Sequence, residues 1–407
     1  MPNINIYSMT PSQYLALTTK NINSLYFLSN GQLYKGDILI NNKAILIPNG
    51  EDYPVQGISN TLYTKESGEC ALWNGSNYTI ISYTAFTQVE DLEDRIDSTA
   101  SFAIDGISFI QKTIKHLKSL NLNSIKAYAF INCKQLIDVD LPNVTTIKAH
   151  AFQGCTSLTS INLPNLTTIE GSEYAFQGCT SLTSINLPNL TTVTNAPYAF
   201  QGCTSLTSIN LPNLTNLFSY IFQDCTSLTS INLPNLTTVS ATYAFRGCTS
   251  LTSINLPNLT TIGGNGNFQG CTSLTSINLP NVTSISSSNF QGCTSLTSIN
   301  LPNLTTIGGG ANFQDCTSLT SINLPNLTAI NGYTFQGCTS LTTVILRYNE
   351  LVQLQNISAF NNTPIKSGTG YVYVPDDLVN TYKAATNWKS YKNQIKGISE
   401  LPNDGGE

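Results

Sequence analysis

Near-copies of one short segment fill the middle of this chain. The segment FQGCTSLTSINLPNLTTV, residues 176–193, recurs with few changes between Phe130 and Phe335. Each copy carries one cysteine, and consecutive repeat cysteines lie 22 to 24 residues apart. They are Cys133, Cys155, Cys179, Cys203, Cys225, Cys248, Cys271, Cys293, Cys316 and Cys338. A period of this length predicts a solenoid, because each coil leaves apolar faces that only the next coil can cover.

A single copy predicts the layout of a whole coil. Residues 160–163 alternate between polar and apolar as in a short strand with one buried face. Pro164 marks the end of that strand, because proline has no amide hydrogen for a strand ladder. Phe176 and Cys179 are spaced as on a helical turn opposite the strand, which would place one ring and one thiol per coil in the core. We therefore expect a mainly β solenoid of about ten to eleven coils.

The order of residues within a unit carries a family resemblance. The run Leu-x-x-Ile-x-Leu-Pro, a further apolar position and then Ala-Phe-x-x-Cys resembles the units of the BspA-like leucine-rich-repeat family. The resemblance extends over residues 113–363 and implies a leucine-rich-repeat array. It also implies an adhesive role, since the family includes surface proteins of bacteria and protists.

The repeat decays after Cys338, where the array is expected to end. YVYVPDDLVNTYKAATNWKSYKNQI, residues 371–395, predicts a strand followed by an amphipathic helix that uses Leu378, Tyr382 and Trp388. Similar segments terminate other arrays of the same family. We therefore expect residues 364–407 to form a C-terminal cap and tail.

Residues 1–86 contain short strand-like runs separated by turn residues, which predicts a small β-hairpin module. Two stretches, SLYFLSNGQLYKGDILI at 24–40 and TLYTKESGECALWNGSNYTIISY at 61–83, resemble the hairpin modules at the start of many phage virion proteins. That resemblance implies attachment to other virion proteins through this module.

Residues 87–112 are expected to form a neck helix and a linker strand. In TQVEDLEDRIDS, residues 87–98, an a, d, a spacing is occupied by Val89, Leu92 and Ile96. This spacing fits one heptad of a coiled coil, which would make a homo-oligomer, with a trimer favoured over a dimer. It equally fits an amphipathic linker helix that packs on its neighbours.

Composition narrows the possible functions. Charged residues make up 10% of the chain and the net charge is −5, so the basic surface of a nucleic-acid-binding protein is absent. No apolar run could cross a membrane and no export signal is visible, so we expect neither membrane insertion nor evident secretion. The two histidines, His116 and His150, belong to no catalytic or metal-ligand motif. We expect no enzyme activity, no metal and no cofactor.

Two recurring polar features have ordinary structural explanations. The repeat cysteines are expected to be buried free thiols, because stacked side chains point alike and not at one another. The Asn-Leu-Thr or Asn-Val-Thr triplets follow a strand-ending proline in every unit, so turn hydrogen bonding explains them better than glycosylation does. They begin at Asn143, Asn165, Asn189, Asn213, Asn235, Asn258, Asn281, Asn303 and Asn326.

The coils offer two candidate binding surfaces. The exposed strand face carries Ser184, Asn186, Ser208, Asn210, Ser230, Asn232, Ser253 and Asn255. It could bind a neutral polysaccharide, or its side chains could pair only with their own copies. The variable loop edge carries Tyr174, Tyr198, Phe218, Tyr220, Tyr243 and Tyr333. It could contact host surface polysaccharide or protein, or its variation could be drift in unconstrained loops.

The leading hypothesis is a non-enzymatic fibre or appendage protein of a phage virion, which would present the solenoid to a host cell surface. A bacterial surface adhesin of the BspA-like kind is the alternative. A purely structural virion decoration protein is a second alternative. Recognition of a specific partner is more consistent with the loop edge than with the strand face. The strand face repeats the same side chains in every coil, and a uniform surface cannot distinguish one partner from another.

Overall fold

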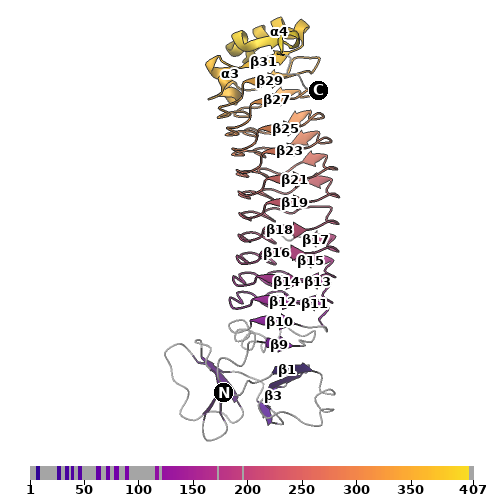
Figure 1. The fold of residues 1–407 in the computed structure, drawn as a ribbon, viewed down its shortest axis with the longest axis vertical. Coiled ribbons are helices and arrows are strands. Elements are labelled where there is room, and N and C mark those ends of the chain that lie inside the picture. Colours follow the sequence, from indigo (N-terminus) through magenta and orange to yellow (C-terminus); the bar gives the residue numbers. More distant parts are fainter. Residues whose placement is uncertain are drawn as a thin grey trace. The chain divides into compact units, whose positions relative to one another are not determined.

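The computed structural model describes the short strands β1 to β9 within residues 6–90, and residues 115–118, 122–171, 174–194 and 197–402 (Figure 1). The chain divides into two compact units, residues 1–190 and residues 191–407. Within each unit the coils pair through parallel strands, and this confirms the predicted β solenoid.

Antiparallel hairpins are present at the start of the first unit, as predicted. Strand β2 pairs with β3, β3 with β4, β6 with β7 and β7 with β8, all antiparallel. Strand β1 instead pairs with β2 in parallel, and β5 pairs with β6 in parallel. The bounds are β1 Ile6–Met9, β2 Leu25–Leu28, β3 Leu33–Lys35, β4 Ile38–Ile40, β5 Ile45–Ile47, β6 Thr61–Lys65, β7 Cys70–Trp73 and β8 Tyr78–Ile81.

The helix predicted over residues 87–98 is wrong at its start, because Gln88–Glu90 form strand β9. Val89 lies opposite Leu117 of strand β10, His116–Lys118, in a parallel pair. The backbone of β9 also pairs with β1, where Tyr7 lies opposite Glu90. A helix here would leave the backbone groups of β10 without a strand partner on this side, and such groups need partners. The coiled-coil positions Leu92 and Ile96 lie outside the described residues, as does the predicted linker strand.

Two parallel strand stacks run through the repeats of the first unit. The longer strands form one stack, in which Asp138 lies opposite Ser160 and Val139 opposite Ile161. The shorter strands form the other, in which Ile125 lies opposite Ile147 and Ile147 opposite Ile169. The bounds are β11 Ser124–Ile125, β12 Asp138–Asp140, β13 Thr146–Ile147, β14 Ser160–Asn162, β15 Thr168–Glu170 and β16 Ser184–Asn186.

The second unit continues the same register in its own coils. Ser230 lies opposite both Ser208 and Ser253, so equivalent residues of successive repeats are paired. The bounds are β17 Thr192–Thr194, β18 Ser208–Asn210, β19 Ser230–Asn232, β20 Thr238–Val239, β21 Ser253–Asn255, β22 Thr261–Ile262, β23 Ser276–Asn278, β24 Ser284–Ile285, β25 Ser298–Asn300, β26 Thr306–Ile307, β27 Ser321–Asn323, β28 Ala329–Ile330, β29 Thr343–Ile345 and β30 Gln353–Leu354.

One phenylalanine per coil forms the centre of the core. In the first unit the rings of Phe130, Phe152 and Phe176 stack at 5.2 and 5.4 Å. In the second unit the stack from Phe200 to Phe360 keeps separations of 5.3 to 5.6 Å. These rings are fully buried, so each ring covers the face of its neighbour.

The helical turn predicted around the Phe and Cys of each unit is a non-helical turn in the structure. The amide of Phe222 donates to the carbonyl oxygen of Ala244 in the next coil, at 2.8 Å. That of Phe152 bonds to Ala175 in the same way. Alternate amides of the turn therefore connect successive coils, while the amides between them, such as that of Cys225 to the carbonyl of Phe222, bond within the turn.

The C-terminal cap closes the phenylalanine stack of the second unit, as predicted. Trp388 and Tyr391 contact Phe360, the last ring, at 6.1 and 5.4 Å. The indole of Trp388 donates to the carbonyl of Val352, and the hydroxyl of Tyr382 accepts from the amide of Val352. Burial raises the pKa of Tyr382 to about 12.

The cap is made of several short helices and two strands, so the single amphipathic helix predicted from the sequence is broken. Asn387 interrupts it with a φ of 66°. The bounds are η2 Ile357–Phe360, α3 Pro364–Ser367, β31 Tyr371–Val374, η3 Asp376–Leu378, α4 Val379–Ala384, η4 Trp388–Gln394, β32 Ile395–Gly397 and η5 Ile398–Glu400.

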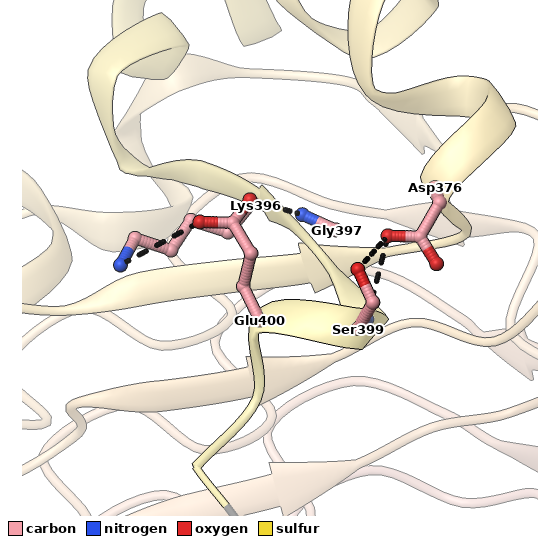
Figure 2. A network of polar contacts seen from close by, with 5 residues as sticks. All are labelled: Asp376, Lys396, Gly397, Ser399 and Glu400. Carbon is pink, nitrogen blue, oxygen red and sulfur yellow. Dashed lines mark hydrogen bonds and ion pairs between the residues drawn. The ribbon is translucent and has the colours of Figure 1, made fainter.

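A polar network covers the last strand of the cap (Figure 2). The carboxylate of Asp376 accepts from the hydroxyl and the amide of Ser399, at 2.6 and 3.3 Å. Glu400 accepts from the amide of Gly397 at 3.2 Å and lies 3.9 Å from the ammonium of Lys396. Strand β32 ends its four-stranded sheet, and a strand edge with unpaired backbone groups invites pairing with other chains. Charged side chains and a bonded turn at this edge oppose such pairing.

Candidate binding surface

From Ser160 to Asn323 the strand face is exposed, polar and uncharged, as predicted, whereas the preceding strand β12 carries Asp138 and Asp140. Ser160 and Asn162 are exposed on either side of the buried Ile161, and the following coils repeat this arrangement. The predicted face residues Ser184, Asn186, Ser208, Asn210, Ser230, Asn232, Ser253 and Asn255 are all exposed.

Side chains on this face bond to one another along the stack. Asn255 donates to the side-chain oxygen of Asn232 at 2.9 Å, and Asn300 donates to that of Asn278 at 2.8 Å. Asn162 makes the equivalent bond to Asp140 at 2.7 Å. These bonds use up hydrogen-bonding capacity that a ligand would need, which favours a structural role for the face.

The asparagines of the Asn-Leu-Thr and Asn-Val-Thr triplets make hydrogen bonds at the turn, as predicted, and their partners lie in the preceding coil. The side-chain amide of Asn258 donates to the carbonyl of Pro234 in the preceding coil at 2.8 Å. The same bond, at 2.8 to 2.9 Å, is made by Asn165, Asn189, Asn235, Asn281, Asn303 and Asn326. These asparagines therefore link the turn of each coil to the proline carbonyl of the preceding coil.

The ten repeat cysteines are buried free thiols, as predicted. Each thiol with a described bond donates to the carbonyl of the phenylalanine in the preceding coil, as Cys293 does to Phe268 at 3.1 Å. Burial raises the pKa of Cys293 and of Cys338 to about 12. Neutral thiols of this kind behave as small core side chains.

Within the described ranges, no three His, Cys, Asp or Glu side chains lie together in a way that could hold a metal ion. No helix of the described part of the chain is long and apolar enough to cross a bilayer.

The loop edge differs from the strand face in its backbone. Tyr174, Tyr198, Tyr220, Tyr243 and Tyr333 all have φ between 58° and 66°. The left-handed region is unfavourable for side chains other than glycine by about 1–2 kcal/mol per residue. The sixth predicted edge residue, Phe218, does not share this conformation and is half-buried. The edge tyrosines therefore hold a conformation that their residue type disfavours.

Several of these rings pack against a ring of the next coil, some stacked and some tilted. In the second unit Tyr198 lies 4.5 Å from Tyr220, and Tyr220 lies 5.5 Å from Tyr243. In the first unit Tyr128 lies 4.4 Å from His150, which lies 5.1 Å from Tyr174. Sequence reasoning missed Tyr128 and His150, although they precede Ala-Phe at the same place in the repeat.

The following coils of the second unit replace these rings with small residues. Gly266, Ser288 and Ala311 occupy the same position and also have positive φ. Tyr333 restores a ring there, and its side chain is 53% exposed. The loop edge of this unit therefore carries tyrosines from Tyr198 to Tyr243 and small residues in the next three coils. A single exposed tyrosine, Tyr333, follows.

A buried asparagine ladder accompanies the coils with small residues. Asn267, Asn289 and Asn312 replace the alanine found beside the tyrosines, and none is accessible to solvent. The amide of Asn267 donates to the side-chain oxygen of Asn289 at 3.0 Å, and that of Asn289 donates to Asn312 at 3.2 Å. In the sequence, this ladder is marked by the change from Ala-Phe to Asn-Phe. Because the change lies in the variable segments, the sequence alone assigned these asparagines to the loop edge.

The similarity of this chain to known proteins lies in its repeats. The family model of the BspA type leucine rich repeat region matches in six copies, over residues 69–172, 102–216, 172–280 and 264–371. These stretches include well over half of the chain's 407 residues. No curated protein sequence matches.

Several solved leucine-rich-repeat structures are similar. A leucine-rich repeat protein from Bacteroides ovatus is 25% identical, with 86% of this chain and 100% of that chain covered and a TM-score of 0.46. A leucine rich cell surface protein from Faecalibacterium prausnitzii is 18% identical, with 91% and 95% covered and a TM-score of 0.37.

Proposed function

Because this chain belongs to the BspA-type leucine-rich-repeat family, we propose that it is a non-enzymatic adhesin displayed at a cell surface. Its solenoid would present the loop edge to polysaccharide or protein on another surface. Stacked repeats suit this role because each coil extends the same surface by one step.

The observation that carries this proposal is the row of half-exposed, stacked tyrosines at the loop edge. Tyr198, Tyr220 and Tyr243 place large rings, in contact from coil to coil, at a left-handed position that other coils fill with small residues. Disfavoured conformations that persist in a fold often mark functional positions. Tyrosine is also common in binding surfaces, because its ring is apolar and its hydroxyl is polar.

Charge limits how a partner could be held. Between residues 197 and 346 the only charged residues are Asp224, Arg246 and Asp315. An interface with so few ion pairs should respond little to salt, because screening acts on charges. The adhesion we propose is therefore salt-insensitive.

A phage virion fibre is the second candidate. It is favoured by the antiparallel hairpins over Leu25–Ile40 and Thr61–Ile81, the stretches that resemble virion modules. We rank it below the adhesin because the family match extends through the whole array, and resemblance to this family implies a surface protein. A purely structural virion protein would suit the self-paired strand face but leaves the tyrosine row without a role.

Homo-oligomerisation also remains a proposal. Strand β9 removes Val89 from the predicted heptad, and Leu92 and Ile96 stay the proposed positions for contact between copies. Light scattering of the full chain tests this, and a monomeric mass would remove the proposed oligomer.

Cell binding tests the adhesin directly. The labelled full chain is incubated with epithelial cells and with several bacterial species, and bound protein is measured by flow cytometry. We expect saturable binding to at least one cell type, with little change between about 0.1 and 0.5 M NaCl, over which the screening length falls by roughly half. The proposal fails if no cell type is bound. Presence of the chain in purified virions would favour the fibre.

A further inference from the structure

Two neighbouring coils of the second unit depart from the repeat within the same four-residue segment. Most units read Phe-Gln-Gly-Cys, but residues 222–225 read Phe-Gln-Asp-Cys and residues 245–248 read Phe-Arg-Gly-Cys. Asp224 and Arg246 thus replace a glycine and a glutamine. Because other coils fold with Gly and Gln at these positions, the solenoid does not require either charge.

The backbone brings both charges beside two tyrosines whose rings pack against each other at a tilt of 40°. The amide of Gln223 donates to the carbonyl of Tyr220 at 3.0 Å, and that of Arg246 donates to Tyr243 at 3.3 Å. The two turns are joined by a bond of 2.8 Å from the amide of Asp224 to the carbonyl of Arg246. The tyrosine rings lie 5.5 Å apart, and the guanidinium of Arg246 lies 5.1 Å from the centre of the Tyr243 ring.

The Tyr220–Arg246 patch consists of Tyr220, Gln223, Asp224, Tyr243 and Arg246. Asp224 and Arg246 are exposed, and the other three are half-exposed. We infer that this patch binds a neutral glycan. The inference rests on the proposed adhesive function and assigns a ligand class to one part of the loop edge.

The side chains of the patch match the groups on a sugar. A carboxylate accepts hydrogen bonds from hydroxyls, while guanidinium and amide nitrogens donate to hydroxyl and ring oxygens. Aromatic rings contact the apolar faces that sugar rings expose between their hydroxyls. The patch therefore supplies acceptors, donors and apolar surface within two neighbouring coils.

The polar groups of the patch keep hydrogen-bonding capacity, although Arg246 lies over the Tyr243 ring and Tyr220 packs on both Tyr198 and Tyr243. Within the described residues no ion pair joins Asp224 and Arg246, and the side-chain nitrogen (Nε2) of Gln223 has no hydrogen-bond partner. Gln223 accepts one bond, from Gln201 at 3.0 Å, through its carbonyl oxygen. The strand-face asparagines, in contrast, already bond to their copies.

Charge and size favour a neutral glycan over other partners. One carboxylate and one guanidinium balance, so an anionic chain would gain one contact and be repelled by the other. Nucleic acid requires several cations along its backbone. A stable protein interface buries about 800 Å² on each partner. This patch spans only two coils, and the small residue Gly266 follows it, so the patch suits a smaller ligand.

Restoring the repeat provides a clean test. The double variant Asp224→Gly and Arg246→Gln gives both coils the residues that their neighbours use, so it should fold normally. Asp224→Gly also places glycine at a backbone φ of 58°. Asp315→Gly is the matched control, because that aspartate has the same place in its repeat but Ala311 in place of the tyrosine.

The full chain and both variants are applied to an array of neutral, sialylated and sulfated glycans, and affinities for the neutral glycans retained are measured by calorimetry. We expect retention of neutral glycans, at least a tenfold loss of affinity in the double variant and no change in Asp315→Gly. Circular dichroism and thermal unfolding confirm that the variants are folded. The inference is overturned if no neutral glycan is retained, or if the double variant binds as well as the original chain.

Cell binding separates this inference from the proposed adhesin. If the original chain and the double variant adhere to cells equally, and adhesion survives periodate oxidation of cell-surface sugars, the adhesin stands with a protein partner and the glycan site is wrong. If the original chain adheres to no cell type, the adhesin itself fails, whatever the array shows.

Discussion

Tyrosine occupies a left-handed backbone position in six described coils, and this is the least expected residue-scale feature of the molecule. Tyr128, Tyr174, Tyr198, Tyr220, Tyr243 and Tyr333 share it. The conformation costs about 1–2 kcal/mol per residue, while a stacked aromatic pair contributes about 0.5–1.5 kcal/mol beyond burial. Stacking between coils therefore offsets much of the strain. Tyr333 is the most exposed of these rings and has Ala311 at the same position in the preceding coil.

The buried thiols make stability depend on pH. Burial raises the pKa of Cys293 and Cys338 to about 12, from 9.0. Thiols of the unfolded chain therefore lose protons near pH 9, while the folded ones retain theirs. Stability is complete below pH 9 and falls as pH rises towards 12. At about pH 10.5 each such thiol accounts for a loss of about 2 kcal/mol.

We expect the guanidinium midpoint of unfolding to be clearly lower at about pH 10.5 than at about pH 7.5. Cys293→Ser is the matched control, because its hydroxyl can make the same bond to Phe268 without titrating in this range. Between the two pH values, this variant should lose about 2 kcal/mol less of its free energy of unfolding than the original chain does. A midpoint that does not change with pH would contradict the buried, neutral thiols.

At the scale of the structural elements, two kinds of coil alternate in blocks over residues 197–315 of the second unit, before Tyr333-Thr334 pairs a tyrosine with a buried threonine. One kind places Ala or Ile beside a tyrosine, as in Tyr220-Ile221 and Tyr243-Ala244. The other places a buried asparagine beside a small residue, as in Ser288-Asn289. The asparagine side chains satisfy backbone groups of the loops, since Asn289 also donates to the carbonyl of Ser286 at 3.0 Å. Buried polar groups must be satisfied in this way to be tolerated.

Asn289→Ala tests the internal ladder. It removes the acceptor for the amide of Asn267 and the donor to Ser286, so buried groups lose their partners. We expect a loss of about 2–4 kcal/mol in the free energy of unfolding, from about 1–3 kcal/mol for each unsatisfied group. Asn300→Ala, an exposed asparagine of the same coil, should cost less than about 1 kcal/mol. Equal effects in chemical denaturation would show that the ladder contributes nothing specific.

The repeat predicted most of the solenoid because its side chains have one role in every coil. Ile161, Phe176 and Cys179 lie in the core as their spacing predicts. The turn around Phe176 was predicted as helical because the spacing of apolar residues cannot reveal that backbone bonds run between coils. The strand at Gln88–Glu90 was missed for a similar reason. Its partner, His116–Lys118, lies 28 residues further along the chain, and no local pattern specifies a pair at that distance.

The candidate site was predicted only in part. The edge tyrosines were found because they vary against a constant background. Their backbone conformation and the place of Gln223, Asp224 and Arg246 beside them depend on the stacking of turns, which the sequence does not encode locally. The asparagine ladder was hidden because asparagine is common in loops and its burial follows only from the fold.

At the scale of the whole molecule, constant and variable parts of the repeat have different roles. Phenylalanine, cysteine, leucine and isoleucine set the spacing of the coils, and the strand-face asparagines bond to their own copies. The loop edge changes from coil to coil without disturbing this core. A surface that can vary freely on a fixed frame is where a binding protein can acquire specificity.

Cell binding by two matched variants of the full chain tests this division most directly. The edge variant carries Tyr198→Ala, Tyr220→Ala and Tyr243→Ala, and the face variant carries Asn210→Ala, Asn232→Ala and Asn255→Ala in the same three coils. Flow cytometry should show that the face variant binds cells as the original chain does, while the edge variant loses most of its binding. Loss of binding in the face variant with retention in the edge variant would contradict the account.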